Sequence, residues 1–319
     1  MKKKKLSDKQ KTIMQDIRRK DSADLYEGFV LVNKGKVVDI FCPEIGKVIQ
    51  INSTKRHQLI VGDSVGLSRE DVPNIIMRHN RRNALIRLDD PMRHPIAANI
   101  DMAYVVLAPV PAPWDESIAQ YLCYLYVLNI PCAFIINKID LGQLSPSILS
   151  RLNYAQDILN CPVFKVSASS GEGLVALRQH LEQKTSIMIG PSGVGKSSLV
   201  QALLAEKNIV IGDLSAAQKG RHTTSVTQKY LIDQNNGWLI DSPGVRQCGL
   251  GSILKEEILL GFPDFQKYPC QFRNCNHIQS KGCGVQHALD EKILPAHRYE
   301  DYLFLCQKFS VAHRYERHF

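Results

Sequence analysis

Residues 190–197 read Gly190-Pro191-Ser192-Gly193-Val194-Gly195-Lys196-Ser197, and they match the phosphate-loop pattern G-x-x-x-x-G-K-[ST] at every required position. The apolar run 186–189 before this stretch predicts a short buried strand, and the apolar spacing after it predicts a helix over 196–204. Glycines let the backbone curl so that N–H groups and a helix N-terminus face an anion. The stretch therefore predicts a loop that binds nucleotide phosphates.

Within such a loop, side chains and backbone have separate tasks. Lys196 is expected to reach the β- and γ-phosphates, and the Ser197 hydroxyl to ligate Mg²⁺. The remaining nucleotide contacts are expected from Gly190, Pro191, Ser192, Gly193, Val194, Gly195 and Ser198.

The identity of the base is indicated by Asn137-Lys138-Ile139-Asp140, an N-K-x-D motif that follows a predicted strand over 132–136. The Asp140 carboxylate can accept hydrogen bonds from guanine N1–H and the 2-amino group, and adenine offers neither donor. An unpaired buried acceptor costs about 1–3 kcal/mol, which is enough to select GTP over ATP. We expect Lys138 to lie along the base and Asn137 to tie this loop to the phosphate loop.

Ser167-Ala168 follows the next predicted helix and strand. In this position after N-K-x-D, the pair is expected to supply a backbone N–H to the guanine carbonyl.

Two further stretches are expected to respond to the γ-phosphate. Asp241-Ser242-Pro243-Gly244 forms a D-x-x-G loop in which Asp241 holds Mg²⁺ through water and the Gly244 N–H contacts the γ-phosphate. Residues 220–224 form the candidate switch I, in which either Thr223 or Thr224 completes the metal shell.

The segment from about 100 to 250 has the rhythm of an α/β domain. Its predicted elements are strand 102–108, helix 116–128, strand 132–136, helix 147–159, strand 163–166, helix 174–181 and a hairpin of strands 228–232 and 238–240. GTPases ordinarily begin with the phosphate loop, whereas here the base motif comes first. The sequence therefore predicts a doubly wound P-loop domain with circularly permuted motif order.

Residues 26–83 contain five short β-rich runs, over 28–32, 36–41, 47–51, 58–67 and 74–77, separated by turn residues. Basic side chains at 34–36, 55–57 and 78–82 favour an oligonucleotide-binding (OB) barrel. An SH3-like packing barrel fits the pattern equally well. The Lys-rich tail over 1–22 is expected either to touch nucleic-acid phosphates or only to aid solubility.

A metal site is predicted near the C-terminus by the pattern C-x₄-C-x-H-x₅-C. Four ligands of these types suit one tetrahedral, structural Zn²⁺: Cys270, Cys275, His277 and Cys283. Free thiols are the alternative, and His287 is a less favoured substitute ligand. A helix over 296–317 carries five basic residues that form either a phosphate-facing surface or a plain solvated face: Arg298, Lys308, His313, Arg314 and Arg317.

The composition sets broad limits. A chain of 319 residues is long enough for two or three domains, and a net charge of +9 favours a polyanionic partner, although a merely soluble basic protein is the alternative.

No apolar run approaches the ~20 residues that span a bilayer, and no apolar stretch follows Met1 and its lysines, so we expect a cytoplasmic protein without a membrane partner. The six other cysteines are expected to be reduced and buried. Monomer is the default expectation.

This order of motifs, together with the barrel, the Gly220–Thr224 stretch and the cysteine-rich segment, resembles the RsgA (YjeQ) family of ribosome-dependent GTPases over nearly the whole chain. The resemblance implies a factor in late maturation of the small (30S) ribosomal subunit that contacts 16S rRNA and hydrolyses GTP when bound there. It also implies a basic tail over 1–22, an OB-fold over 23–84, a GTPase domain over 85–250 and a mainly α, zinc-binding domain over 251–319.

The residue after the D-x-P-G stretch is Val245, where Ras-type domains place a water-orienting Gln. An apolar side chain cannot orient water, so intrinsic hydrolysis should be slow. His222 is the candidate for a water-positioning group, and a histidine that only packs or contacts RNA is the alternative. A rival hypothesis is a GTP-gated rRNA-binding placeholder with little hydrolysis.

Overall fold

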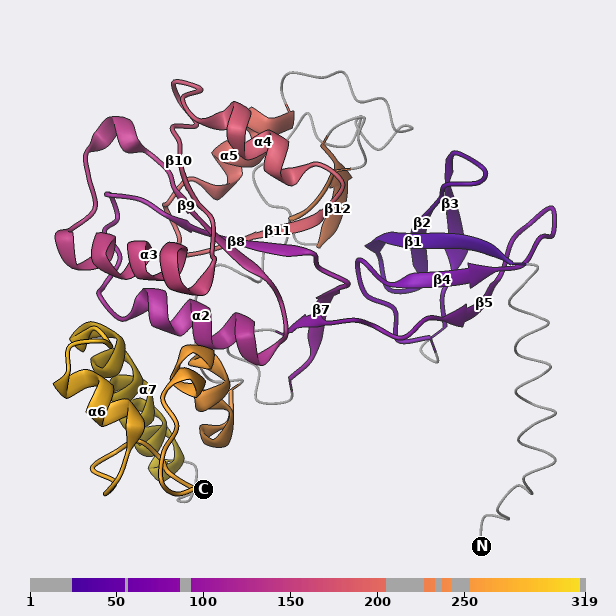
Figure 1. Ribbon diagram of the computed structural model, residues 1–319. Coiled ribbons are helices and arrows are strands. Elements are labelled where there is room, and N and C mark those ends of the chain that lie inside the picture. Colours follow the sequence, from indigo (N-terminus) through magenta and orange to yellow (C-terminus); the bar gives the residue numbers. More distant parts are fainter. Residues whose placement is uncertain are drawn as a thin grey trace, which may run out of the picture.

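The computed structural model describes residues 25–54, 57–86, 93–204, 227–232, 237–241 and 253–315. A small β-rich unit, a central sheet covered by helices, and a helical C-terminal region follow one another along the chain (Figure 1). The basic tail over 1–22 lies outside the described residues.

The central sheet has the strand order β10-β9-β8-β11-β13-β12. Its strands are β8 (Met102–Leu107), β9 (Cys132–Ile136), β10 (Val163–Lys165), β11 (Thr185–Ile189), β12 (Gln228–Leu231) and β13 (Trp238–Asp241). β8, β9, β10, β11 and β13 are parallel to one another, and β12 pairs antiparallel with β13. Every residue of β9 is buried, as expected for a parallel strand covered on both faces.

Helices cover both faces of this sheet, so the predicted doubly wound arrangement is confirmed (Figure 1). Helices α2 (Ser117–Val127) and α3 (Pro146–Leu159) pack into one core cluster, and α4 (Leu174–Leu181) and α5 (Lys196–Leu204) pack into the other. The order is permuted as predicted, because β11, the strand that leads into the phosphate loop, is only the fourth strand of the central sheet along the chain and follows β9, which leads into the N-K-x-D motif.

The N-terminal unit contains five strands around its own apolar cluster. These are β1 (Tyr26–Asn33), β2 (Val37–Cys42), β3 (Lys47–Asn52), β4 (Ser64–Leu67) and β5 (Ile75–Arg78). β1 pairs with both β2 and β4, β2 with β3, and β4 with β5. β1 also meets the edge of the central sheet, where Val32 pairs with Gln228 of β12.

The fourth strand is shorter than the predicted 58–67. Gln58 and Gly62 have positive φ angles of 46° and 88°, and Asp63 accepts a hydrogen bond from the Ile60 N–H at 2.8 Å. These turns keep residues 58–63 out of a regular strand. A Cβ at position 62 would lie 2.1 Å from the Ala98 carbonyl oxygen, so the glycine permits this close approach.

A two-stranded hairpin of β6 (Ala84–Ile86) and β7 (Pro95–Ala98) links the five-stranded N-terminal unit, the predicted barrel, to the central sheet. The sequence did not predict this hairpin.

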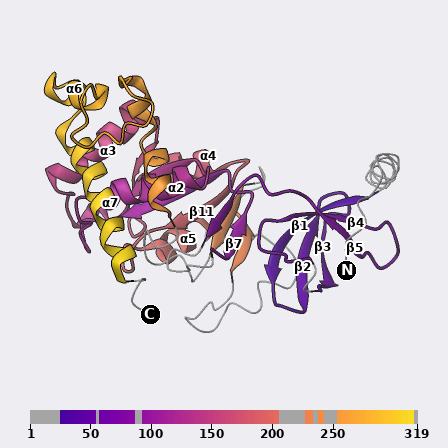
Figure 2. The same ribbon diagram turned by 90° about the horizontal axis from the view of Figure 1, so that it is seen from below.

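The C-terminal region contains the 3₁₀ helices η3 (Lys255–Gly261) and η4 (Pro263–Lys267), followed by α6 (Gly284–Asp290) and α7 (Ala296–Tyr315). Seen from below, these elements lie against the side of the molecule that carries α2 and α3 (Figure 2). Among the described helices, we found none long and apolar enough to cross a membrane.

Two arginines that were expected on basic surfaces, Arg298 and Arg81, are instead paired with buried carboxylates. Arg298 is 2% exposed and binds Asp264 of η4, with an Nη2–Oδ1 distance of 2.7 Å, so it faces the interior and not a phosphate. In the basic stretch 78–82, Arg81 binds the buried Asp63, with an Nε–Oδ1 distance of 2.6 Å. Both carboxylates neutralise arginines that the sequence had suggested for RNA.

Candidate nucleotide-binding site and metal centre

The predicted nucleotide motifs follow the carboxyl ends of neighbouring parallel strands. Residues 137–140 follow β9, 167–168 follow β10, 190–195 follow β11, and Asp241 ends β13. In open α/β sheets, ligands bind outside this edge. The fold therefore brings the described parts of these motifs to one edge of the sheet, although they are spread over more than a hundred residues of chain.

The buried Asn137 side chain joins three of these loops. Its Nδ2 donates to the Val194 carbonyl of the phosphate loop at 2.9 Å, and its Oδ1 accepts from the Ala168 N–H at 3.1 Å. Asn137 thus connects the base motif both to the phosphate loop and to the Ser167-Ala168 pair.

Gly195 permits this contact. Its φ is +92°, and a Cβ at this position would lie 2.4 Å from Asn137 Nδ2. A side chain at 195 would be strained by the positive φ and would also push Asn137 away.

Asp140 lies on the short 3₁₀ helix η1 (Ile139–Leu141) and is exposed. Its Oδ1 accepts from Ser167 Oγ at 2.6 Å, and its Oδ2 accepts from Ser169 Oγ at 3.4 Å. The Ser167 hydrogen bond is the main cause that lowers the pKa of Asp140. An ionised carboxylate is the form that accepts two hydrogen bonds from a guanine edge.

The two lysines of the site contact the phosphate loop. Lys138 has a left-handed backbone, and its Nζ donates to the Gly193 carbonyl at 2.6 Å and the Val110 carbonyl at 2.9 Å. Lys196 Nζ donates to the carbonyls of Gly190 and Pro191 at 2.7 and 2.6 Å. Both ammonium groups are thus held beside the loop.

At the start of α5, Ser197 and Ser198 are exposed, as is Ser192 in the loop itself. Asp241 is partly buried at the end of β13, next to β11 in the sheet.

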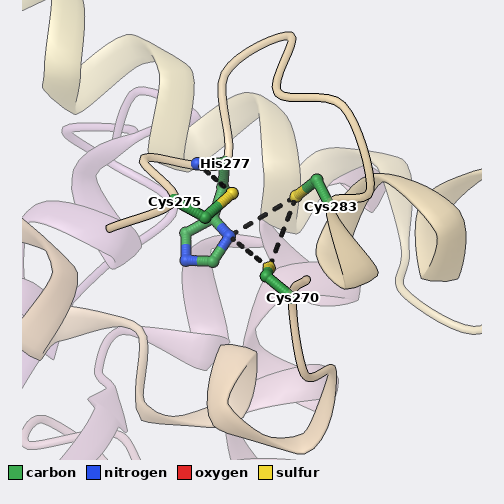
Figure 3. A group of neighbouring side chains, drawn as sticks. All are labelled: Cys270, Cys275, His277 and Cys283. Atoms are coloured by element: carbon green, nitrogen blue, oxygen red, sulfur yellow. Dashed lines mark hydrogen bonds between the residues drawn. The ribbon is translucent and has the colours of Figure 1, made fainter. Parts of the chain in front are cut away.

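Four side chains from the cysteine-rich segment converge in the C-terminal region (Figure 3). The donor atoms of Cys270, Cys275, His277 and Cys283 all lie within 4.8 Å of one another. His277 Nδ1 is 3.4 Å from Cys270 Sγ and 3.5 Å from Cys283 Sγ, and these two sulfurs are 3.8 Å apart. His287 is not part of this group among the described residues.

The donor set fits zinc. Three sulfurs and one imidazole nitrogen form the closed tetrahedral set of structural zinc sites. Backbone N–H groups also point at the sulfurs, from Gly284 to Cys270 Sγ at 3.3 Å and from His277 to Cys275 Sγ at 3.4 Å. Such donors stabilise thiolates, which is the form that binds the metal.

Helix α7 supports the same segment. Tyr299 Oη donates to the His277 carbonyl, and Tyr302 Oη donates to the Asn276 carbonyl, both at 2.7 Å. These bonds fix the backbone of the ligand loop, including the left-handed His277 with φ 58°.

Comparisons with known proteins show the family of this chain. A family model described as RsgA GTPase matches residues 78–251. A protein of Hahella chejuensis named small ribosomal subunit biogenesis GTPase RsgA is 35% identical over 289 residues, covering 87% of this chain and 82% of that protein. The chain belongs to the RsgA GTPase family. A protein of the same name from Haemophilus influenzae strain PittEE is 34% identical, covering 86% of this chain and 83% of the relative.

Two solved structures have the same fold. YjeQ from Thermotoga maritima superposes with a TM-score of 0.72 at 25% identity, covering 89% of this chain and 98% of that one. YloQ, whose structure is described as a circularly permuted GTPase, also has a TM-score of 0.72, at 23% identity and with 91% and 97% coverage. At 23% identity, the similarity to YloQ shows a shared fold and nothing about function.

Several residues singled out from the sequence lie outside the described residues: His222, Thr223, Thr224, Gly244, Val245 and, among the cysteines expected to be buried, Cys248. One contributor to the site was missed. Ser169 contacts Asp140, and the run Ser169-Ser170 after Ala168 was the signal that pointed to it.

Proposed function

We propose that this chain is a GTP-hydrolysing enzyme that binds the small ribosomal subunit and assists its late maturation. The main structural support for GTP binding is Asn137, which joins the N-K-x-D loop to the phosphate loop and to Ala168 through hydrogen bonds of 2.9 and 3.1 Å. The names of the relatives, small ribosomal subunit biogenesis GTPase, support the role in the ribosome.

Guanine recognition is assigned to Asp140, with Lys138 along the base and the Ala168 N–H directed at the guanine carbonyl. The phosphates are assigned to residues 190–198, with Lys196 at the β- and γ-phosphates. Mg²⁺ is assigned to Ser197, Asp241 and one of Thr223 and Thr224, and Gly244 is assigned to the γ-phosphate. The hydrogen bonds of Ser167 and Ser169 to Asp140 support the first assignment, because they favour an ionised carboxylate.

One structural Zn²⁺ is assigned to Cys270, Cys275, His277 and Cys283. When bound, the ion would cross-link a segment that has few apolar residues of its own. Besides the four ligands, the hydrogen bonds of Tyr299 and Tyr302 from α7 hold the backbone of the ligand loop in place.

For hydrolysis, GTP is converted to GDP and phosphate by an attacking water. Val245 offers no polar group to orient this water, so the intrinsic reaction should be slow. His222 is assigned to positioning the water once the ribosomal subunit has ordered switch I. We assign the contact with the ribosomal subunit to 16S rRNA, in keeping with the net charge of +9. We also assign the protein to the cytoplasm, and we expect it to be a monomer.

A second candidate function, a GTP-gated rRNA-binding placeholder, is favoured by the same apolar Val245. A GTPase assay with and without purified small ribosomal subunits separates the two functions. The enzyme should be stimulated strongly by subunits, and His222→Ala should keep GTP and subunit binding while losing most of the stimulation. Tight GTP-dependent subunit binding without faster phosphate release would favour the placeholder.

A further inference from the structure

A polar cavity of about 440 Å³ lies between the N-terminal barrel and the central sheet. Its lining includes Glu27 and His79 from the barrel, and Asp101, Thr185 and Lys229 from the sheet. Thr185 is the first residue of β11, whose other end leads into the phosphate loop. The cavity is therefore at the opposite edge of the sheet from the nucleotide site.

Lys229 on β12 is the unusual residue of this cavity. Its side chain is 7% exposed, and its ammonium donates to Thr185 Oγ1 at 3.0 Å. The ammonium also lies 5.5 Å from the ring centre of Phe29 and 5.1 Å from that of Trp238. Rings and a hydroxyl stabilise a cation only partly, so this charge is buried without full compensation.

The carboxylates nearby are already occupied. Asp101 Oδ1 accepts from Arg82 at 2.7 Å, and its Oδ2 accepts from the Thr185 N–H at 2.8 Å. Glu27 lies 3.1 Å from His79 Nε2. Within the described part of the chain, no carboxylate lies within ion-pair distance of Lys229, although the lining as a whole holds two carboxylates, Asp101 and Glu27, for the two cations Lys229 and Arg82.

Two further donors face the same space. His79 Nε2 is buried and, despite its closeness to Glu27, makes no hydrogen bond of good geometry. Arg82, whose side chain is 62% exposed, lines the cavity from the chain segment between barrel and sheet. Because Arg82 contacts Asp101 and His79 lies beside Glu27, Lys229 is the one of these three groups that an anion can approach without competing with a carboxylate.

We propose that this cavity is a second anion site, which binds a phosphate group through Lys229. A phosphate fits because its negatively charged oxygens can accept from the Lys229 ammonium, which has no carboxylate at ion-pair distance among the described residues and gives one hydrogen bond to Thr185. The group is carried either by an RNA backbone or by a small free phosphate. Bound there, it would contact the barrel and the GTPase sheet together.

The protonation of Lys229 supports this proposal. Burial lowers the pKa of Lys229 to about 8, Asp101 opposes this effect and Arg82 adds to it. Glu27 and His79 are the other titratable groups that line the cavity. A bound anion stabilises the charged ammonium, so anion affinity should fall as the pH rises through about 8.

The test is calorimetric titration of inorganic phosphate into the full chain saturated with Mg²⁺ and GDP, which keeps the phosphate loop occupied. Lys229→Met, which removes the charge at similar length, should weaken phosphate binding about tenfold or more. Lys165→Met is the matched control, because this exposed lysine on β10 lies at the far edge of the sheet. Unchanged GDP affinity in both variants reports an intact fold.

Two further measurements complete the test. Sulfate, which does not titrate in this range, should bind the wild-type chain more weakly at about pH 9 than at about pH 7. A short oligouridylate that binds more tightly than phosphate, and competes with it, identifies RNA as the source, whereas tighter binding of phosphate identifies a small free anion. Absence of millimolar phosphate binding, equal binding by Lys229→Met, or a flat sulfate profile would each overturn the proposal.

Discussion

Arg151 of α3 and Asp301 of α7 form a buried ion pair, with Nη2 and Oδ1 3.0 Å apart and side-chain exposures of 8% and 4%. This pair fastens the C-terminal helix to the helix layer of the GTPase sheet. Arg151 Nη1 also donates to Ser147 Oγ at 2.6 Å, and Ser147 Oγ donates to Asp115 at 2.7 Å. Asp115 belongs to the loop after β8, whose Val110 carbonyl accepts from Lys138. The N-K-x-D loop and α7 are thus linked through these hydrogen bonds and the chain segment between Val110 and Asp115.

Breaking this pair should destabilise the protein strongly. Asp301→Leu leaves Arg151 buried and unpaired, which should cost about 3–5 kcal/mol of unfolding free energy. Denaturant unfolding measures the change, with the exposed pair Arg69–Glu44 as the control, where Arg69→Ala should cost only about 0–1 kcal/mol. Combining Asp301→Leu with Arg151→Met should recover much of the loss. Equal losses at the buried and exposed pairs would contradict this account.

Gly195→Ala should disrupt the nucleotide site. The added Cβ would lie 2.4 Å from Asn137 Nδ2, so the hydrogen bonds that join the base motif to the phosphate loop would be displaced. We expect GDP affinity to fall about tenfold or more in a fluorescence titration. Gly171→Ala is the matched control, since it also has a positive φ, of 83°, but has no atom within 4 Å of the new Cβ. Similar losses in both variants would mean that backbone strain alone is responsible.

The central sheet could be predicted from the sequence because its inner strands β8, β9 and β11 are almost entirely buried and its helices have regular apolar spacing. The predicted helix 174–181 agrees with α4 to the residue, and strand 132–136 with β9. The short hairpin of β6 and β7 could not be predicted, because three or four residues carry too little periodicity.

Local motifs predicted the cluster of three cysteines and one histidine and the N-K-x-D loop, since the residues of each are close in sequence. Ion pairs between residues that are far apart in the sequence could not be predicted in this way. Arg81 and Arg298 were expected on basic surfaces, yet Asp63 and Asp264 bind them, from 18 and 34 residues away in the chain. No sequence spacing distinguishes a solvated arginine from one with a buried partner of this kind.

Asp140→Asn should change the base preference from guanine to xanthine. The amide NH₂ can donate to the C2 carbonyl of xanthine, whereas the carboxylate pairs with the two donors of guanine. Competition of GTP and XTP against a fluorescent GDP analogue measures the preference. We expect GTP to weaken and XTP to strengthen, and an unchanged preference for GTP would remove Asp140 from the base pocket.

Removing one zinc ligand should release the metal and loosen the C-terminal region. Cys275→Ser leaves three of the four ligands, so zinc content should fall well below the one ion per chain expected in the wild type. Metal analysis and limited proteolysis report the two effects. Cys306→Ser, which changes a partly buried cysteine outside the cluster, should leave both unchanged. Wild-type protein that contains no zinc when freshly purified would contradict the assignment.

Lys229→Met should stabilise the protein near neutral pH in a buffer free of phosphate and sulfate. Burial lowers the pKa of Lys229 from 10.5 to about 8, so the unfolded chain binds more protons than the folded chain between these two values. The cost of burying the charge is therefore fully present below about pH 8, and it declines as the pH rises toward 10.5.

The size of this cost follows from the two pKa values, whose difference corresponds to roughly 3 kcal/mol. Lys229→Met removes it, so its unfolding free energy should exceed that of the wild type near pH 7, and the gap should shrink steadily above pH 8. Urea unfolding of both proteins across this pH range gives the difference, in which the titration of all other groups cancels. A gap that is absent near pH 7, or that grows with pH, would show that Lys229 is well solvated in the folded protein. In that case the cavity beside β12 would hold no poorly compensated ammonium to attract an anion.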